Sequence, residues 1–172
     1  MSPQSKRELT LLVVAASVLG VVDSMVPKPL PFLRIGLANI PSVISILRFG
    51  WLRTLELNVT RALAVAMVTG TVGTPTFILS LAGASVSATV MGIVYGLFRG
   101  RISPIGVSVS GAVTSLWTQL IAASIILHDI PLQNLIPPLT IWGVLSGLLV
   151  GVLARNAMVK LLDFEVLRRA EG

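Results

Sequence analysis

Three ionisable side chains interrupt one apolar stretch of this sequence and are the first candidates for chemistry. Arg53 and Glu56 are three residues apart, a spacing that lets them pair on one face of a helix, and Arg61 lies deeper in the same stretch. An ionisable group inside a membrane span costs about 2.5–3.5 kcal/mol on insertion scales, so Glu56 and Arg61 are functional candidates. The alternatives are a structural Arg53–Glu56 ion pair and an Arg61 side chain that reaches inward or pairs across the bundle.

No motif in the sequence supports catalysis by this chain alone. The phosphate loop G-x-x-x-x-G-K-[ST] is absent, so any pumping must be powered by another subunit. H-E-x-x-H, the aspartate-rich D-D-x-x-D cluster that holds magnesium diphosphates, and cysteine are absent too. The single histidine, His128, adjoins Asp129 in an expected turn and is more typical of a solvated loop than of a catalytic base. We expect a non-enzyme without metal or cofactor.

The composition predicts a membrane-embedded chain. Of 172 residues, 54% are hydrophobic and 12% are charged, which lies outside the range of soluble globular domains. A hydrocarbon core of about 30 Å needs roughly 20 apolar residues per helix. We therefore expect one all-α domain, a compact bundle of about six transmembrane helices at residues 9–26, 38–50, 52–72, 77–98, 104–127 and 135–154.

Three details of this layout depend on local sequence. The run at 38–50 is short and is expected to be a short or partly re-entrant helix. Lys6 and Arg7 before the first apolar run resemble a signal peptide, but five more apolar runs follow, so we interpret that run as a retained first span. Residues 156–172 form an amphipathic cytoplasmic tail, expected to lie along the membrane surface.

The basic residues predict the orientation in the membrane. The net charge of +6 would suggest nucleic acid in a soluble protein, but these residues flank apolar runs, as topology determinants do. If the N-terminus is cytoplasmic, only Lys28 and Arg34 lie outside. The other eleven lie in or near the cytoplasmic half: Lys6, Arg7, Arg48, Arg53, Arg61, Arg99, Arg101, Arg155, Lys160, Arg168 and Arg169. Both termini are therefore expected in the cytoplasm of the cell, with 27–36 and 128–134 outside.

Candidate ligand-binding residues lie in the expected outer half. Lys28 and Arg34 break the charge rule, which indicates either an anionic ligand or neutralisation of one of them by Asp23. Anchoring at the membrane interface explains Trp117 and Trp142 equally well, so Gln119 is the stronger candidate for ligand binding. The full candidate set is Lys28, Arg34, Asn39, Trp117, Gln119, His128, Asn134, Thr140 and Trp142.

Small residues recur every fourth position, a spacing that lets membrane helices approach closely. One set, in the fourth run, is Ser80, Ala84, Ala88, Gly92, Gly96 and Gly100, and a second, in the sixth, is Gly143, Gly147 and Gly151. We interpret both as packing contacts of a tight bundle, with oligomer contact as the alternative. The first span carries a shorter pair, Ala16 and Gly20.

The segment Pro31-Phe32-Leu33-Arg34-Ile35-Gly36-Leu37-Ala38-Asn39-Ile40-Pro41 resembles the substrate-binding S components of energy-coupling-factor (ECF) vitamin transporters. Riboflavin-type members have an apolar PFL-basic segment and a D-I-P-like turn at this place, where this chain has Asn39-Ile40-Pro41. The string Gly36-Leu37-Ala38-Asn39-Ile40 and the six-span layout are more similar to the Gx transporter family, also labelled heptaprenyl diphosphate synthase component I. The layout covers residues 9–155, and the motif about a dozen residues.

This resemblance implies an S component that captures a small molecule at its outer face, beneath the first loop. It would dock on a transmembrane coupling subunit driven by two ATPases, and the missing phosphate loop fits that division of labour. The first span of such proteins presents an Ala-x-x-x-Ala pair to the coupling subunit, and Ala16 with Gly20 is the match here. Flavin-like, quinone-precursor and other vitamin-sized ligands stay open. A membrane accessory to heptaprenyl diphosphate synthesis and a small scaffold or channel-like protein are the alternatives.

Overall fold

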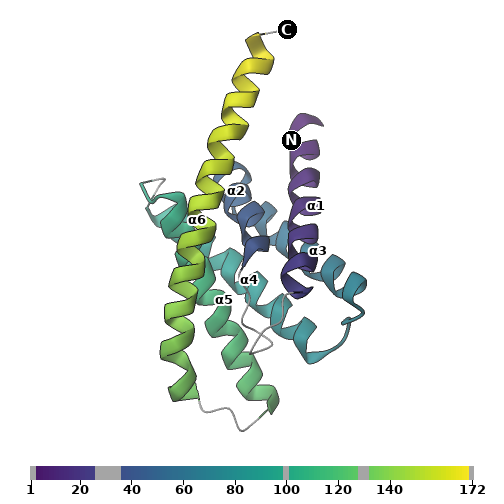
Figure 1. Ribbon diagram of the computed structural model, residues 1–172, viewed down its shortest axis with the longest axis vertical. Coiled ribbons are helices and arrows are strands. Elements are labelled where there is room, and N and C mark those ends of the chain that lie inside the picture. The colour runs from purple at the N-terminus through teal and green to yellow at the C-terminus, as the bar shows by residue number, and fades with distance from the viewer. Residues whose placement is uncertain (1–2, 26–35, 99–100, 128–131, 171–172) are drawn as a thin grey trace.

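A computed structural model describes residues 3–25, 36–98, 101–127 and 132–170, and these ranges contain helices and turns but no strand. The expected all-α bundle is confirmed (Figure 1). Its elements are α1 (Pro3–Met25), the 3₁₀ helix η1 (Leu37–Asn39), α2 (Ile40–Phe49), α3 (Trp51–Thr69), α4 (Pro75–Leu97), α5 (Pro104–Leu127) and α6 (Leu132–Ala170).

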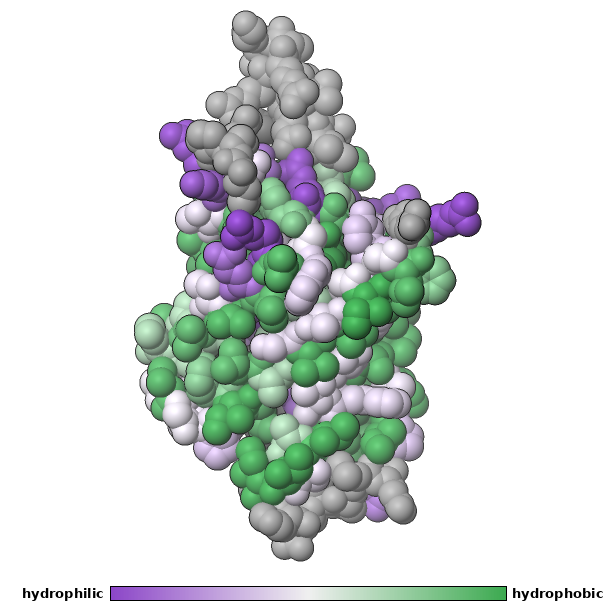
Figure 2. Space-filling model, turned by 180° about the vertical axis from the view of Figure 1, so that it is seen from behind, coloured by the Kyte–Doolittle hydropathy of each residue, from purple (hydrophilic) through white to green (hydrophobic). Residues whose placement is uncertain are grey.

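Four of these helices, α1, α4, α5 and α6, are long and apolar enough to cross a membrane. α2 is apolar but has only 10 residues, and α3 carries Arg53, Glu56 and Arg61, so neither meets that description by itself. Large apolar side chains are exposed along the long helices, and apolar side chains cover the middle of the face in Figure 2. Exposing so much apolar surface to water would be unfavourable, so the protein is a multi-pass membrane protein.

Glycines and a threonine cap set the ends of α3. Gly50 has φ 82° and Gly70 has φ 67°, a backbone region that side-chain-bearing residues rarely adopt. An added Cβ would meet nothing within 4 Å at either glycine, so the backbone angle itself favours glycine. After Gly70, the Thr71 amide donates to Ala66 O at 2.9 Å, which closes the helix end. Thr74 then caps α4 by accepting a hydrogen bond from the Phe77 amide.

α6 differs from the expected layout because it continues without a break to Ala170. A separate tail was expected from residue 156. The sequence between Ala154 and Ala170 contains neither proline nor glycine, and nothing else there stops a helix. At 1.5 Å per residue its 39 residues extend about 58 Å, roughly twice a hydrocarbon core. The C-terminal part of α6 therefore projects beyond the other helices (Figure 1).

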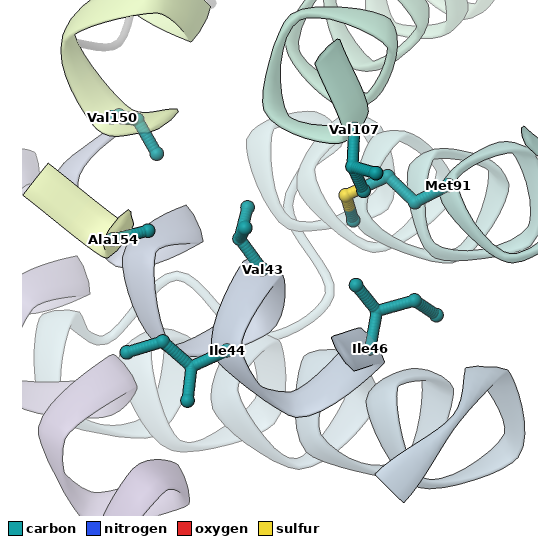
Figure 3. Close-up of a cluster of buried hydrophobic side chains, with 7 residues drawn as sticks. All are labelled: Val43, Ile44, Ile46, Met91, Val107, Val150 and Ala154. Atoms are coloured by element: carbon teal, nitrogen blue, oxygen red, sulfur yellow. The ribbon is translucent and has the colours of Figure 1, made fainter. Parts of the chain in front are cut away.

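α2 is a short helix buried at the centre of the bundle. Its residues from Pro41 to Ile46 are all buried. Figure 3 shows its apolar side chains facing residues of α4, α5 and α6. An apolar helix surrounded on all sides is typical of a core helix. The cluster consists of Val43, Ile44, Ile46, Met91, Val107, Val150 and Ala154.

Buried polar side chains join α2 to its neighbours. Ser42 Oγ donates to Asn58 Oδ1 at 2.5 Å, and Asn58 Nδ2 donates to Ala84 O on α4 at 3.0 Å. Asn58 is 1% exposed, so one side chain of α3 satisfies groups on two other helices. Such interhelical hydrogen bonds stabilise membrane bundles by about 0.6 kcal/mol on average. They fix how α2 sits between α3 and α4.

The glycines of α6 meet the backbone of α5, as the packing interpretation expected. An added Cβ would lie 3.1 Å from Val113 Cα at Gly143, 2.7 Å from Val109 Cα at Gly147 and 2.6 Å from Ile105 Cα at Gly151. The partners also recur every fourth residue and run in the opposite direction. This is the close antiparallel approach that small residues permit.

The small-residue set of α4 behaves differently at its C-terminal end. Ala84 and Ala88 are buried, and a Cβ at Gly92 would lie 2.5 Å from Trp51 Cβ. At Gly96, which is exposed, a Cβ would meet nothing within 4 Å. The expectation that Gly96 packs within the bundle is therefore wrong for this structure, because Gly96 lies on an exposed face of α4. Gly100 lies outside the described residues.

Candidate functional site

A cavity of about 370 Å³ lies between α1, η1, α3, α4 and α5, with Ser146 of α6 at its edge. It is formed by the C-terminal halves of α1 and α3, the N-terminal half of α4 and the middle of α5. These halves belong to one end of the bundle, the end predicted to face outward. Its volume falls in the range of small-molecule sites. Its principal polar residues are Asp23, Asn39, Arg61, Thr69, Ser80 and Gln119.

Arg61 ties α3 to the end of the first loop. Its Nη1 donates to Ala38 O at 2.7 Å and to Asn39 Oδ1 at 3.1 Å. Both acceptors lie in η1, directly before the buried α2. The guanidinium group therefore reaches inward, as one of the sequence interpretations proposed. It holds the amide of Asn39 at the cavity wall.

Gln119 lies across the cavity on α5 and is 6% exposed. Its Nε2 donates to Ser115 O at 3.2 Å and to Ser115 Oγ at 3.0 Å. Gly83 of α4 makes room for it, because an added Cβ at Gly83 would lie 2.8 Å from Gln119 Nε2. The close approach of α4 to this side chain holds the glutamine in place.

Asp23 is 2% exposed and lines the cavity near the C-terminus of α1. The cavity thus contains a carboxyl group, a guanidinium group and two amides. The remaining lining residues are either apolar, such as Val65, Leu116 and Phe77, or small residues and residues that bear a hydroxyl group. Polar groups set among apolar ones in a concave site can bind and orient a small molecule.

The structure brings Asn39 and Gln119 together with Arg61 around the cavity. Trp117, Thr140, Trp142 and Asn134 are not part of its lining. Trp117 Nε1 donates to Thr140 Oγ1 at 2.9 Å on the outside of the bundle, where Trp117 is 44% exposed. This position suits interfacial anchoring. Lys28, Arg34 and His128 lie outside the described residues.

Glu56 does not line the cavity. It accepts a hydrogen bond from Arg53 at 2.6 Å, and both side chains are about half exposed. The pair therefore forms as the structural interpretation expected. Exposed pairs of this kind contribute 0 to about 1 kcal/mol.

The pair Ala16 and Gly20 faces the interior of the bundle. Ala16 is 0% exposed, and a Cβ at Gly20 would lie 2.7 Å from Val65 Cγ2 of α3. The exposed side of α1 carries larger residues, including Val14 and Val18. A partner helix could reach Ala16 and Gly20 only after α1 moves away from α3.

Most cavity residues were not selected from the sequence as ligand-binding candidates. Seven of them bear a hydroxyl group: Ser24, Thr69, Thr71, Thr76, Ser80, Ser115 and Ser146. Two pairs have helical spacing, Thr76 with Ser80 and Ser115 with Gln119, and each pair shares one helix face. That spacing was the available signal. Within the described ranges, no group of three or more His, Cys, Asp or Glu residues could hold a metal ion.

The fold and the cavity define a class: a multi-pass helical membrane protein with a small, partly polar cavity between its helices. The particular family follows from comparison with protein-family models. The model described as "Heptaprenyl diphosphate synthase component I" matches residues 12–157, and the chain belongs to this family. The family expected from the Gly36–Ile40 string is thereby confirmed. Searches against curated proteins and against solved structures gave no significant match.

Proposed function

We propose that this protein is the substrate-binding membrane subunit, or S component, of an ECF-type importer for a vitamin-sized molecule. The observation that carries the proposal is the 370 Å³ cavity in the predicted outer half, lined by Asp23, Asn39, Arg61 and Gln119. Asn39 belongs to the motif that resembles S components. The proposal assigns binding to this chain and assigns energy coupling to a transmembrane subunit and two ATPases.

The family description favours a second candidate, a membrane component of a heptaprenyl diphosphate synthase. A diphosphate requires cationic groups or carboxylates that hold magnesium. Among the described lining residues, Arg61 is the one cationic side chain and Asp23 the one carboxyl group. This supply of charge supports binding of a small polar molecule better than binding of a diphosphate.

Ligand binding in the cavity is tested with a substitution that fills the cavity with a larger side chain. Ala66 is 3% exposed and lines the cavity, whereas Ala64 of the same helix does not line it. We expect mass spectrometry to find a small molecule released from purified wild-type protein and from Ala64→Leu, and little or none from Ala66→Leu. Thermal melting in detergent checks that both variants fold. The proposed binding function is wrong if the wild type releases no small molecule. The proposed binding site is wrong if folded Ala66→Leu releases as much of the molecule as the wild type.

The orientation is tested by single-cysteine labelling, since the native chain has no cysteine. We expect Leu30→Cys to react with an impermeant reagent in whole cells. Lys160→Cys, at an exposed position of α6, is expected to react only after the membrane is opened, because the basic residues mark the cytoplasmic side. The reverse pattern would place the cavity at the cytoplasmic end and remove the import direction from the proposal.

Docking on a coupling subunit is part of the proposal, and the packing of Ala16 and Gly20 affects how it can be examined. Leucine at Gly20 would meet Val65, so a double leucine variant would disturb the bundle as well as any docking. The exposed residues Val14 and Val18 are the positions where a bulky substitution tests docking without entering the interior.

A further inference from the structure

Exposed basic side chains gather at the end of the bundle that carries the start of α1 and the projecting part of α6 (Figure 1). Leu12 of α1, Ile102 before α5 and Ala157 of α6 all pack against the core cluster of Figure 3, so the segments around them lie close together. Figure 2 shows hydrophilic side chains around one end of the apolar surface. We call the following exposed residues the basic band: Lys6, Arg7, Arg101, Arg155 and Lys160.

The carboxylates whose side chains the structure describes at this end are already engaged in ion pairs. Glu8 Oε2 accepts a hydrogen bond from Arg48 Nη1 at 3.1 Å. Glu56 Oε2 accepts one from Arg53 Nη1 at 2.6 Å. Each pair is neutral as a unit, and neither uses a residue of the basic band. The described side chains of this end therefore carry an excess of positive charge, and that charge is exposed.

Large apolar side chains are exposed beside the basic band. On α1, Leu11 follows Arg7 by one helical turn, and on α6, Val152 precedes Arg155 by about one turn. Both apolar residues lie on the membrane-spanning side of their basic neighbour. A phospholipid joins acyl chains to a phosphate headgroup, so one lipid molecule can contact the apolar residue and the basic residue together.

We infer that the basic band binds the headgroups of anionic phospholipids and thereby holds this end of the bundle at the membrane surface. A zwitterionic headgroup has no net charge, whereas an anionic headgroup supplies the negative charge that the described side chains lack. An acidic protein surface would also offer negative charge, but the exposed apolar residues beside the band favour a lipid. One Lys or Arg near an anionic surface strengthens binding about fivefold.

This inference goes beyond the orientation rule and beyond the proposed function. A topology determinant needs only to flank a span in the sequence. The structure adds that these residues are exposed, lie at one end and border apolar surface. The cavity lies toward the other end of α1, at Gly20, Asp23 and Ser24, so lipid binding at the band does not depend on the proposed S-component role.

The headgroup preference is measured by native mass spectrometry of the full-length protein. The protein is supplied with equal amounts of phosphatidylglycerol and phosphatidylcholine that have the same acyl chains, and the lipids that stay bound are counted. We expect the wild type to retain phosphatidylglycerol about fivefold or more over phosphatidylcholine. The excess is expected to shrink when the mixture is prepared in about 1 M salt, because salt screens exposed charges.

Two variants remove different parts of the basic band. Arg101→Gln/Arg155→Gln/Lys160→Gln is expected to retain the two lipids nearly equally, and Lys6→Gln/Arg7→Gln to show a smaller preference than the wild type. All five positions are exposed, so we expect both variants to melt near the wild type in phosphatidylcholine and detergent. Either folded variant decides the question without the other.

The matched control is Arg53→Gln/Glu56→Gln, which removes an exposed ion pair at the same end and leaves the net charge unchanged. We expect it to keep the wild-type preference, as should Arg101→Lys/Arg155→Lys, which keeps both charges. Equal retention of the two lipids by the wild type would overturn the inference. An undiminished preference in the folded glutamine variants of the basic band, or an equal loss in the control, would overturn it too.

Inorganic phosphate separates a lipid headgroup from a free anion. At the same concentration as the lipid, we expect phosphatidylglycerol to raise the melting temperature of the wild type and inorganic phosphate to leave it unchanged. Equal stabilisation by both would show that the basic band binds a soluble anion, and the assignment to lipid would be wrong.

Discussion

Gly147→Ala is expected to lower the free energy of unfolding by about 1–3 kcal/mol, while Gly96→Ala raises it by about 0.5 kcal/mol. At Gly147 the new methyl group would lie 2.7 Å from Val109 Cα. The obstacle is backbone of α5, which moves only if the two helices separate. At Gly96 there is open space, and alanine loses less backbone entropy on folding than glycine. The same chemical change is thus expected to have opposite signs on two helices.

Thermal melting of both variants in one detergent measures this contrast. Gly151→Ala belongs with Gly147→Ala, because its Cβ would lie 2.6 Å from Ile105 Cα. A loss at Gly96 equal to the loss at Gly147 would show that glycine spacing, and not the α5–α6 approach, determines the effect. Gly106→Ala is a poor control, since a Cβ there would meet Ile102 at 2.8 Å.

Arg61→Met is expected to weaken binding of the compound released from the wild type by at least tenfold, and to lower stability by about 1 kcal/mol. The substitution removes hydrogen bonds to Ala38 O and Asn39 Oδ1. Hydrogen bonds of charged groups contribute about 1.5–3 kcal/mol to stability. The variant, however, no longer has to place a charged side chain in the membrane, which is itself unfavourable. Stability therefore falls little, whereas Asn39 is no longer held at the cavity.

Arg53→Met is the matched control, because Arg53 is on the same helix and its ion pair with Glu56 is about half exposed. We expect its binding and its melting temperature to stay near wild type. Arg61→Lys should recover only part of the affinity, since an ammonium group does not reproduce the planar donor set of a guanidinium group. The proposed role of Arg61 is wrong if Arg61→Met and Arg53→Met bind the released compound equally well.

The site was predictable from sequence only in part. Arg61, Asn39 and Gln119 stood out because polar groups in apolar spans are costly and therefore conspicuous. Thr69 and Ser80 did not, because a hydroxyl that bonds to its own helix costs little in an apolar span. The tryptophans were candidates because they lie in the expected outer half, yet Trp117 and Thr140 bond to each other outside the cavity.

The sequence by itself determined the class of protein, because long apolar runs with basic flanks can satisfy their backbone groups in a membrane only as helices. It also determined the family, through a short string beside the first loop and a match over residues 12–157. Tertiary structure decided which of several similar features are used. Gly147 and Gly96 have the same spacing to their neighbours in sequence, but only Gly147 faces another helix.

The same holds for the cavity and for the buried α2. Hydropathy describes one residue at a time. The size of a cavity depends on the distances between the elements around it, and those distances are set by the side chains packed between them. Asn58 of α3 bonding to Ala84 O of α4 and Arg61 reaching Ala38 O are contacts between residues more than twenty positions apart. Only the tertiary structure shows these contacts, because local sequence patterns do not predict which distant residues meet.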